Sequence, residues 1–167
     1  MDLRAELTPP PVSERHLAEA RREITRIAAL VLDRAANAGE ETGREAIAAF
    51  NARTGHRCTA CDFAAYDGGR GLADFAREAA RPPAPPRVAD VTRTELVEIV
   101  RRLLAAGPDS HHYLRLLEAN VAHPRVADLV FHPPAAPHDT DTEADATPEA
   151  GAERIVDEAL AYRPITL

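Results

Sequence analysis

The sequence contains no tryptophan and no lysine, and it is poor in aromatic residues and glycine. Aromatic side chains make up 4% of its 167 residues, whereas hydrophobic residues as a whole make up 45%. A core is therefore possible, but it must be built mainly from Leu, Ile, Val and Ala. Runs rich in Val, Ile, Thr and Tyr, which are typical of strands, are also missing. These absences favour an all-α fold.

No apolar run reaches the roughly 20 residues that a membrane-spanning helix needs. Residues 1–11 lack the apolar stretch of a signal peptide. We therefore expect a cytoplasmic protein without membrane contact. All 20 cationic residues are arginine, which we interpret as a sign of a GC-rich bacterial genome.

The formal net charge of −7 is concentrated in the second half of the chain. Residues 1–89 carry 13 acidic residues and 13 arginines, whereas residues 90–167 carry 14 acidic residues and 7 arginines. Such a surplus disfavours nucleic acid as a partner, because phosphates need a basic surface. It suits a basic protein partner, since opposite fields speed encounter. The alternative interpretation is that the charge only keeps the protein soluble.

Prolines divide the chain into four segments. The run Thr8-Pro9-Pro10-Pro11 blocks a helix and predicts that residues 1–12 are a disordered lead. Residues 81–90 include four prolines and predict a stiff linker. We expect a small helical N-terminal domain at residues 13–80. Residues 91–167 should form a second helical domain that folds alone.

Capping residues and glycines predict where the helices begin and end. In the first half they are Ser13 as an N-cap, Gly39 as a helix end, Thr42 with Glu45 as a capping box, Gly55 as a stop, and Thr59 with Asp62 around a short turn. In the second half they are the Thr92 and Glu95 capping box, Gly107-Pro108, Asp109, His123-Pro124, and Thr147 followed by Pro148. The second half therefore contains four helices, of which the third is short.

Residues 123–133, with the sequence HPRVADLVFHP, carry the most specific pattern in the chain. A His-Pro pair is followed by Asp128, two aliphatic residues, Phe131, His132 and a final proline. This segment resembles the signature of the colicin and pyocin DNase immunity proteins. Residues 94–100 are similar to the first helix of that family, residues 147–149 to the start of its last helix, and residues 159–165 to the tail of some relatives. The resemblance covers about residues 90–167.

The resemblance implies a distorted four-helix bundle of the colicin immunity type. Such a protein has no catalytic activity and no cofactor. Its partner is the basic nuclease domain of a colicin-like or pyocin-like toxin, which it binds beside the active site so that DNA is shut out. The producing cell is thereby protected.

The resemblance also implies which residues bind the toxin. The short third helix carries the binding core, which corresponds to Asp128, Phe131 and His132. The second helix tunes which toxin is recognised, and its corresponding face consists of Ser110, His111, Leu114, Arg115 and Glu118. Where the family usually has two tyrosines this chain has Phe and His, and that difference leaves the partner's identity open.

Two other function classes remain open. The first is a helical adaptor or regulatory module that binds another protein through the same acidic face. The second is a small enzyme or redox protein, although no Gly-rich phosphate loop, HExxH motif or nucleophile elbow is present. The first half has no recognisable family, and His56, Asp62, Phe63 and Tyr66 faintly echo the signature, as a degenerate duplicate would.

Cys58 and Cys61 form a Cys-x-x-Cys pair close to His56, and they are the weak candidates for a metal site. A structural zinc needs four ligands, and no second cysteine pair exists. A thioredoxin-like redox motif would need a βαβ context, which the sequence does not predict. The simplest interpretation is structural, with Cys61 packed near Phe63 as a small apolar residue.

Overall fold

The computed structural model describes residues 2–32, 37–65, 71–133 and 147–163, with the backbone alone for residues 37–41. Within these ranges the regular structure is helical throughout and contains no strand. The predicted all-α class is therefore confirmed. No helix in the described ranges is long and apolar enough to cross a bilayer.

The chain divides into two compact units. The N-terminal unit consists of Pro10–Pro83, and the C-terminal unit combines Met1–Pro9 with Ala84–Leu167. The division at Pro83 lies inside the predicted proline-rich linker. The first nine residues belong to the C-terminal unit, which no local sequence pattern predicted.

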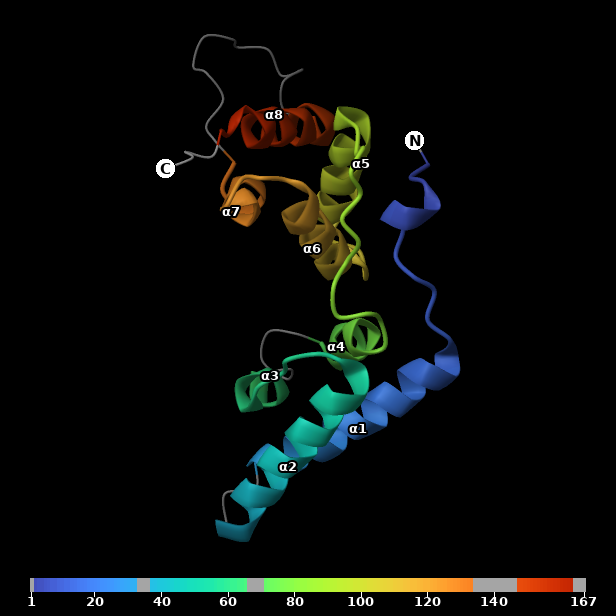
Figure 1. Cartoon of the computed structure of the whole chain (residues 1–167), viewed down its shortest axis with the longest axis vertical. Helices are drawn as coiled ribbons and strands as arrows, with labels where there is room; N and C mark the ends of the chain where they lie inside the picture. Colours follow the sequence, from blue (N-terminus) through green and yellow to red (C-terminus); the bar gives the residue numbers. More distant parts are fainter. Residues whose placement is uncertain (1, 33–36, 66–70, 134–146, 164–167) are drawn as a thin grey trace. The chain divides into compact units, whose positions relative to one another are not determined.

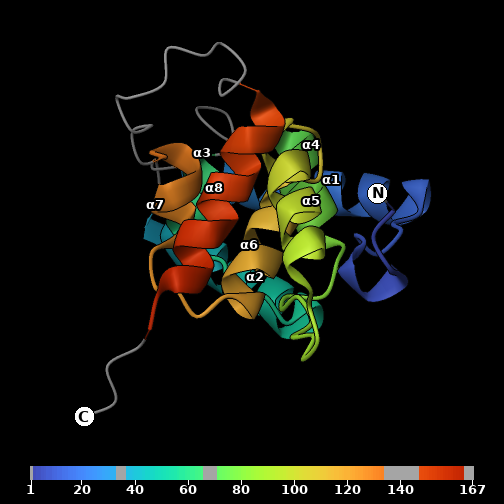
Figure 2. The same cartoon turned by 90° about the horizontal axis from the view of Figure 1, so that it is seen from above.

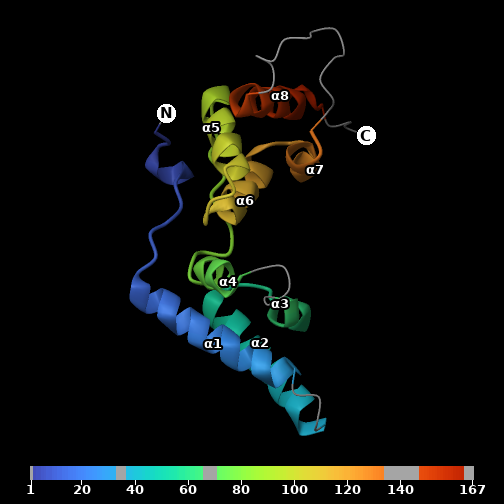
Figure 3. The ribbon, with the colours of Figure 1, turned by 180° about the vertical axis from the view of Figure 1, so that it is seen from behind.

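The first helix of the N-terminal unit is central to its packing. Its four helices are α1 (Glu14–Leu32), α2 (Asn37–Thr54), α3 (Ala60–Ala65) and α4 (Leu72–Ala79). Helix α1 contacts each of the other three (Figure 1, Figure 3). Its first turn is capped as predicted, because the Ser13 Oγ atom accepts a hydrogen bond of 3.3 Å from the His16 amide.

Three phenylalanines fill the core of the N-terminal unit. The ring of Phe63 lies between those of Phe50 and Phe75, with both centroid distances at 5.3 Å. Ile24 and Ile27 of α1 are fully buried against them. Close aromatic pairs of this kind stabilise a core beyond the area that they bury, so few aromatic residues suffice here.

The predicted start of the second helix was wrong. Helix α2 begins at Asn37, so Gly39 does not end a helix, and Thr42 and Glu45 lie inside α2 rather than in a capping box. Glycine in a helix interior costs about 1 kcal/mol relative to alanine. A Cβ atom at Gly43 would lie 3.5 Å from the Leu30 carbonyl oxygen of α1, an ordinary van der Waals contact, so the space there does not require glycine.

The C-terminal unit contains the other four helices. They are α5 (Arg93–Leu104), α6 (Ser110–Asn120), α7 (Val126–Phe131) and α8 (Pro148–Ala161). Helix α5 contacts α6 and α8, and the short α7 contacts α6 and α8 (Figure 2). The predicted Thr92 and Glu95 capping box is confirmed, as is Thr147 as the N-cap before Pro148.

The prediction of a disordered lead at residues 1–12 was wrong for its first part. Residues Ala5–Leu7 form a 3-10 helix, and Leu3 and Leu7 are buried in the core of the C-terminal unit. Between them, the Arg4 Nε atom lies 2.9 Å from a Glu95 carboxylate oxygen. Leu3, Leu7 and the Arg4–Glu95 pair hold this segment against the rest of the C-terminal unit.

Residues 86–88, which were predicted to belong to a linker, are hydrogen-bonded to α6 of the C-terminal unit. The Asn120 side chain at the end of α6 donates to the Pro86 carbonyl oxygen at 3.0 Å and accepts from the Val88 amide at 2.7 Å. Backbone amide and carbonyl groups outside a helix have no partner within a helix. The Asn120 side chain forms hydrogen bonds with two such groups here. This part of the predicted linker is therefore bound to α6.

Candidate functional site

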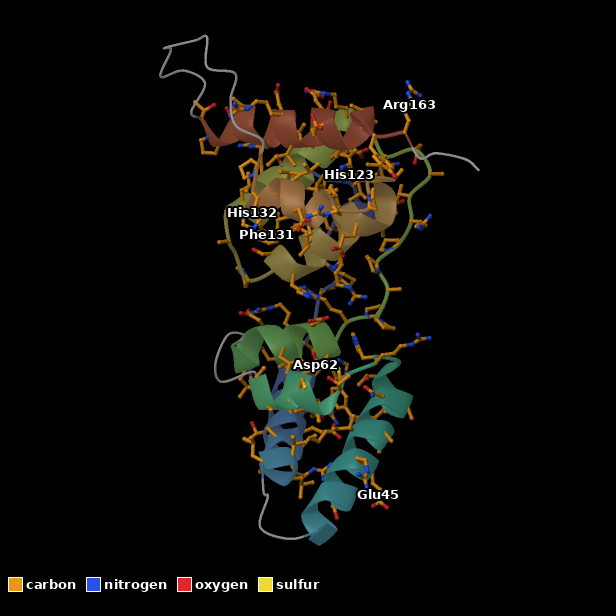
Figure 4. All side chains as sticks on the ribbon, turned by 90° about the vertical axis from the view of Figure 1, so that its left-hand side faces the viewer. Glu45, Asp62, His123, Phe131, His132 and Arg163 are labelled. Atoms are coloured by element: carbon orange, nitrogen blue, oxygen red, sulfur yellow. The ribbon has the colours of Figure 1, made fainter. Side chains whose placement is uncertain are left out.

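Helix α7 is a six-residue helix that buries only one side. Val126 and Val130, one turn apart, are buried. Phe131 projects outward and is 60% exposed, more than any other large apolar residue in the described part of the chain. Figure 4 labels Phe131 and His132 next to each other at the end of this helix. The helix therefore presents an aromatic side chain to solvent instead of adding it to the core.

The ends of α7 are set by its neighbouring residues. Pro124 and Pro133 flank it, and a proline disfavours helix in the residue before it. His132 is the C-cap residue, and its amide donates to the Asp128 carbonyl oxygen at 2.7 Å. This hydrogen bond fixes the backbone of His132, whose side chain is exposed.

Asp128 lies in the first turn of α7 and is already paired. Its Oδ2 atom accepts a hydrogen bond of 2.5 Å from the Nε atom of Arg125. The two side chains are 50% and 77% exposed. Ion pairs as exposed as this are worth only about 0–1 kcal/mol, so the carboxylate stays accessible to another cation. The sequence did not reveal Arg125 as the partner of Asp128.

The predicted binding residues of α6 differ in how far they are exposed to solvent. Leu114 is half-buried against the core, and Ser110 donates from its Oγ atom to the Gly107 carbonyl oxygen at 2.7 Å. His111 and Glu118 are exposed, and Arg115 is half-buried. Residues 111, 115 and 118 share one face by helical spacing. The three residues lie on α6, the helix that contacts α7.

Several acidic residues of the C-terminal unit form ion pairs with arginines of α5. Arg93 donates two hydrogen bonds to Asp157 of α8, at 2.7 and 2.8 Å. The hydrogen bond from Arg93 lowers the pKa of Asp157. Arg101 lies 3.1 Å from Glu149. These pairs link α5 to α8, although the side chains of Asp157 and Glu149 are 58% and 68% exposed, so both carboxylates also stay accessible to solvent. Glu118, by contrast, makes no ion pair within the described residues.

A buried polar network holds α6 against α5. Arg102 donates to Glu98 at 2.9 Å and to the Tyr113 hydroxyl at 3.0 Å. Desolvation raises the pKa of Glu98, but the hydrogen bond and charge of Arg102 outweigh it, and the pKa lies below its ordinary value. Because Tyr113 belongs to α6, this network fixes the helix that carries the residues proposed to select the partner.

An aromatic contact holds the segment before α7 next to the end of α8. The rings of His123 and Tyr162, the residue that ends α8, lie 5.0 Å apart in an edge-to-face arrangement. The His123 Nδ1 atom also accepts from the Arg125 amide at 3.2 Å. His123 was predicted only to end the preceding helix. Its contact with Tyr162 makes it a positioning residue for α7.

The cysteine pair lies in the N-terminal unit. Cys58 is half-buried against the phenylalanine core, whereas Cys61 is exposed. The predicted packing of Cys61 was therefore wrong, and Cys58 occupies that place. The His56 Nε2 atom lies 3.1 Å from the Arg81 carbonyl oxygen. Among the described side chains no group of three or more His, Cys, Asp or Glu is arranged to hold a metal.

The residues of the N-terminal unit that resemble the signature differ from the signature residues in their exposure to solvent. Phe63 is fully buried, and the Asp62 carboxylate accepts from the Thr59 amide and hydroxyl at 2.7 and 2.8 Å, as a capping residue. Tyr66 lies outside the described residues. Only the C-terminal unit therefore presents the exposed arrangement of Asp128 and Phe131.

Comparison with protein-family models, with curated proteins and with solved structures finds no match for this chain.

Proposed function

We propose that this protein is a bacteriocin immunity protein that binds and inhibits the nuclease domain of a colicin-like or pyocin-like toxin. The resemblance of residues 90–167 to that family supports the proposal. So does the order of α5 to α8, four helices of which the third has six residues. The C-terminal unit is then a distorted four-helix bundle of the immunity type.

The exposure of Phe131 is the observation that carries the proposal. A phenylalanine in a short apolar helix ordinarily packs into the core, yet this one is 60% exposed beside two buried valines. Aromatic anchors of this kind supply most of the binding energy in many interfaces. A six-residue helix between two prolines holds the backbone of Phe131 in place, so little backbone entropy is lost on binding.

The charges around Phe131 suit a basic partner. Asp128 offers a carboxylate that forms a weak ion pair with Arg125, and Glu118 is exposed on α6. A nuclease domain must be basic where it contacts DNA phosphates. Opposite charges raise the association rate, and charge-assisted hydrogen bonds to Asp128 strengthen the complex.

Inhibition in this proposal needs no chemistry from the immunity protein. A complex of ordinary size buries about 800 Å² on each partner, which is enough to cover the edge of a nuclease cleft and exclude DNA. Phe131 and Asp128 then form the energetic centre, with His132 beside them. His111, Arg115 and Glu118 discriminate between related toxins, since differences at the periphery decide specificity.

The test is inhibition of DNA cleavage by a panel of recombinant colicin-type and pyocin-type DNase domains. We expect the full-length protein to bind at least one of them and to abolish its cleavage of plasmid DNA at equimolar concentration. Binding to none, together with capture of a non-nuclease protein that depends on Phe131, would identify the chain as a helical adaptor instead. Thioredoxin-like disulfide reductase activity of the purified chain would support the enzyme class.

A further inference from the structure

The N-terminal segment of the chain contacts the C-terminal unit through three side chains. Leu3 and Leu7 are buried in the core of that unit, and Arg4 forms ion pairs with it. The 3-10 helix of the segment, η1 (Ala5–Leu7), lies beside α5 (Figure 1, Figure 3). Its backbone bonds are local, since the Leu7 amide donates to the Arg4 carbonyl oxygen at 3.0 Å. The segment is therefore bound by its side chains, as a short peptide ligand is.

The Arg4 guanidinium contacts two acidic residues at once. Its Nη1 atom donates to an Asp90 carboxylate oxygen and its Nη2 atom to the Asp90 carbonyl oxygen, both at 3.1 Å. Its Nε and Nη2 atoms lie 2.9 and 3.2 Å from the two carboxylate oxygens of Glu95. Several donors in one fixed plane are a property of arginine that lysine does not share. The contact therefore selects arginine at this position.

The part of this site that lies on α5 is held in place without the segment. The amide and the Oγ1 atom of Thr92 donate to the Glu95 carboxylate at 2.8 and 2.9 Å. Leu96 and Ile99 of the same helix belong to the core that receives the two leucines of the segment. A site whose groups are already positioned loses little entropy when it binds a peptide.

A proline-rich connection joins the segment to the N-terminal unit. The run Thr8-Pro9-Pro10-Pro11 contains the division between the two units, and α1 begins only at Glu14. Proline cannot donate a backbone hydrogen bond, so the connection adds little to the docking of the segment. On its far side, the Pro10 carbonyl oxygen accepts from the Arg81 Nε atom at 3.2 Å. The segment is thus a short peptide on a tether that is attached to the N-terminal unit.

We propose that the C-terminal unit has a peptide-binding site beside α5, which recognises the pattern Leu-Arg-x-x-Leu, and that residues 2–8 are its detachable occupant. The two leucines fill the apolar part of the site, and the arginine binds the two acidic residues. A short tether holds the segment near the site at an effective concentration of about millimolar, so the docked state dominates. Release is a local opening that leaves α5 to α8 packed. The inference is independent of the toxin partner, because no residue of this site lies on α6 or α7.

The first test measures whether the site binds the segment as a separate peptide. A fluorescein-labelled peptide with the sequence of residues 2–9 is titrated with the full-length Leu3→Ala/Leu7→Ala double variant, and fluorescence anisotropy reports binding. We expect saturable binding, and binding to the unaltered protein that is weaker by about tenfold or more, because its own segment occupies the site. Equal affinity for the two proteins, or no binding to a double variant whose circular dichroism is unchanged, would overturn the proposal.

Variants of the peptide test the pattern itself. A peptide with Leu7→Ala should bind the double variant about tenfold more weakly or worse, since it loses most of a buried side chain. A peptide with Arg4→Lys keeps the charge but loses the planar set of donors, and it should bind about fivefold more weakly. The matched control is a peptide with Glu6→Gln, at an exposed position of η1, which should not bind more weakly. Equal affinity of all four peptides would show that the site does not read this pattern.

The second test uses the unaltered protein, so it does not depend on the folding of a variant. Trypsin can cut after Arg4 only while the segment is out of its site, whereas a cut after Arg101 needs the unfolding of α5. Mass spectrometry should show that the first cut is about tenfold faster or more under native conditions. The Leu7→Ala variant should be cut after Arg4 about tenfold faster again. Equal rates at the two sites, or a rate at Arg4 that does not respond to Leu7→Ala, would overturn the proposal.

Discussion

The Nε atom of Arg125 lies 2.5 Å from the Oδ2 atom of Asp128, so the carboxylate proposed to meet the toxin is already paired within its own helix turn. Both side chains are largely exposed, and the pair contributes little to stability. A cation of the partner therefore competes with Arg125 for the same carboxylate. In the proposed complex Arg125 would then modulate the affinity, and the sequence pattern alone did not reveal this pair.

Replacing Arg125 with alanine should strengthen binding to a basic nuclease domain. The substitution frees Asp128 and removes a like charge from the interface, so the association rate at low salt should rise by a few fold. The free energy of unfolding should change by less than about 0.5 kcal/mol. Stopped-flow association kinetics provide the measurement. The matched control is Arg15→Ala, which removes an arginine that pairs with Glu19 in the N-terminal unit; an equal increase there would mean that only net charge matters.

The Glu98→Gln variant should destabilise the protein. Glu98 accepts hydrogen bonds from Arg101 and Arg102, and its side chain is only 11% exposed. Losing its charge weakens the network that holds Tyr113, at a cost of about 1–3 kcal/mol. Urea denaturation measures this cost. Glu118→Gln, at an exposed position of α6, is the control and should change stability by less than about 0.5 kcal/mol.

The stability contributed by Glu98 should depend on pH. Its pKa in the folded protein lies below the ordinary value of 4.5. A depressed pKa means that the stabilisation is fully present above the pKa of the unfolded chain and is lost as the pH falls through the folded value. The difference in unfolding free energy between the unaltered protein and Glu98→Gln should therefore be constant near neutral pH and shrink below about pH 4.5. A difference that does not change with pH would contradict this account.

Leu7→Ala should destabilise the C-terminal unit by about 2–4 kcal/mol. Leu7 is fully buried in the core that α5, α6 and α8 form, although it lies far in the sequence from the segment of this unit that begins at Ala84. The measurement is chemical denaturation of the full chain. Leu32→Ala, at a position that is 56% exposed, is the control. A Leu7 variant as stable as the control would show that the N-terminal segment is not part of the core.

The sequence predicted those features of the fold that depend on local interactions. Thr92 and Glu95 were correctly identified as a capping box because both partners lie within one helix turn. Thr147 was likewise correctly identified as the N-cap before Pro148. These signals need no knowledge of distant parts of the chain.

The features that the sequence did not predict depend on tertiary contacts. Arg4 and Leu7 looked like part of a disordered lead because their partners lie more than 80 residues away. Gly39 was predicted to end a helix from its residue type alone, whereas it lies in the first turn of α2, which begins at Asn37. For the site, the Asp128 and Phe131 pattern was visible in the sequence, whereas the contact of His123 with Tyr162 joins two separate segments.

The central claim is that the protein binds a nuclease domain through α7, and the Phe131→Ala variant tests it most directly. The affinity for a DNase domain that the unaltered protein inhibits, and the thermal stability, are measured on the same samples. Leu160→Ala, at an exposed position of α8, is the matched control. The account predicts that Phe131→Ala weakens binding by about 2 kcal/mol or more, with stability unchanged within about 0.5 kcal/mol and no effect of the control. A large loss of stability with unchanged affinity would contradict it.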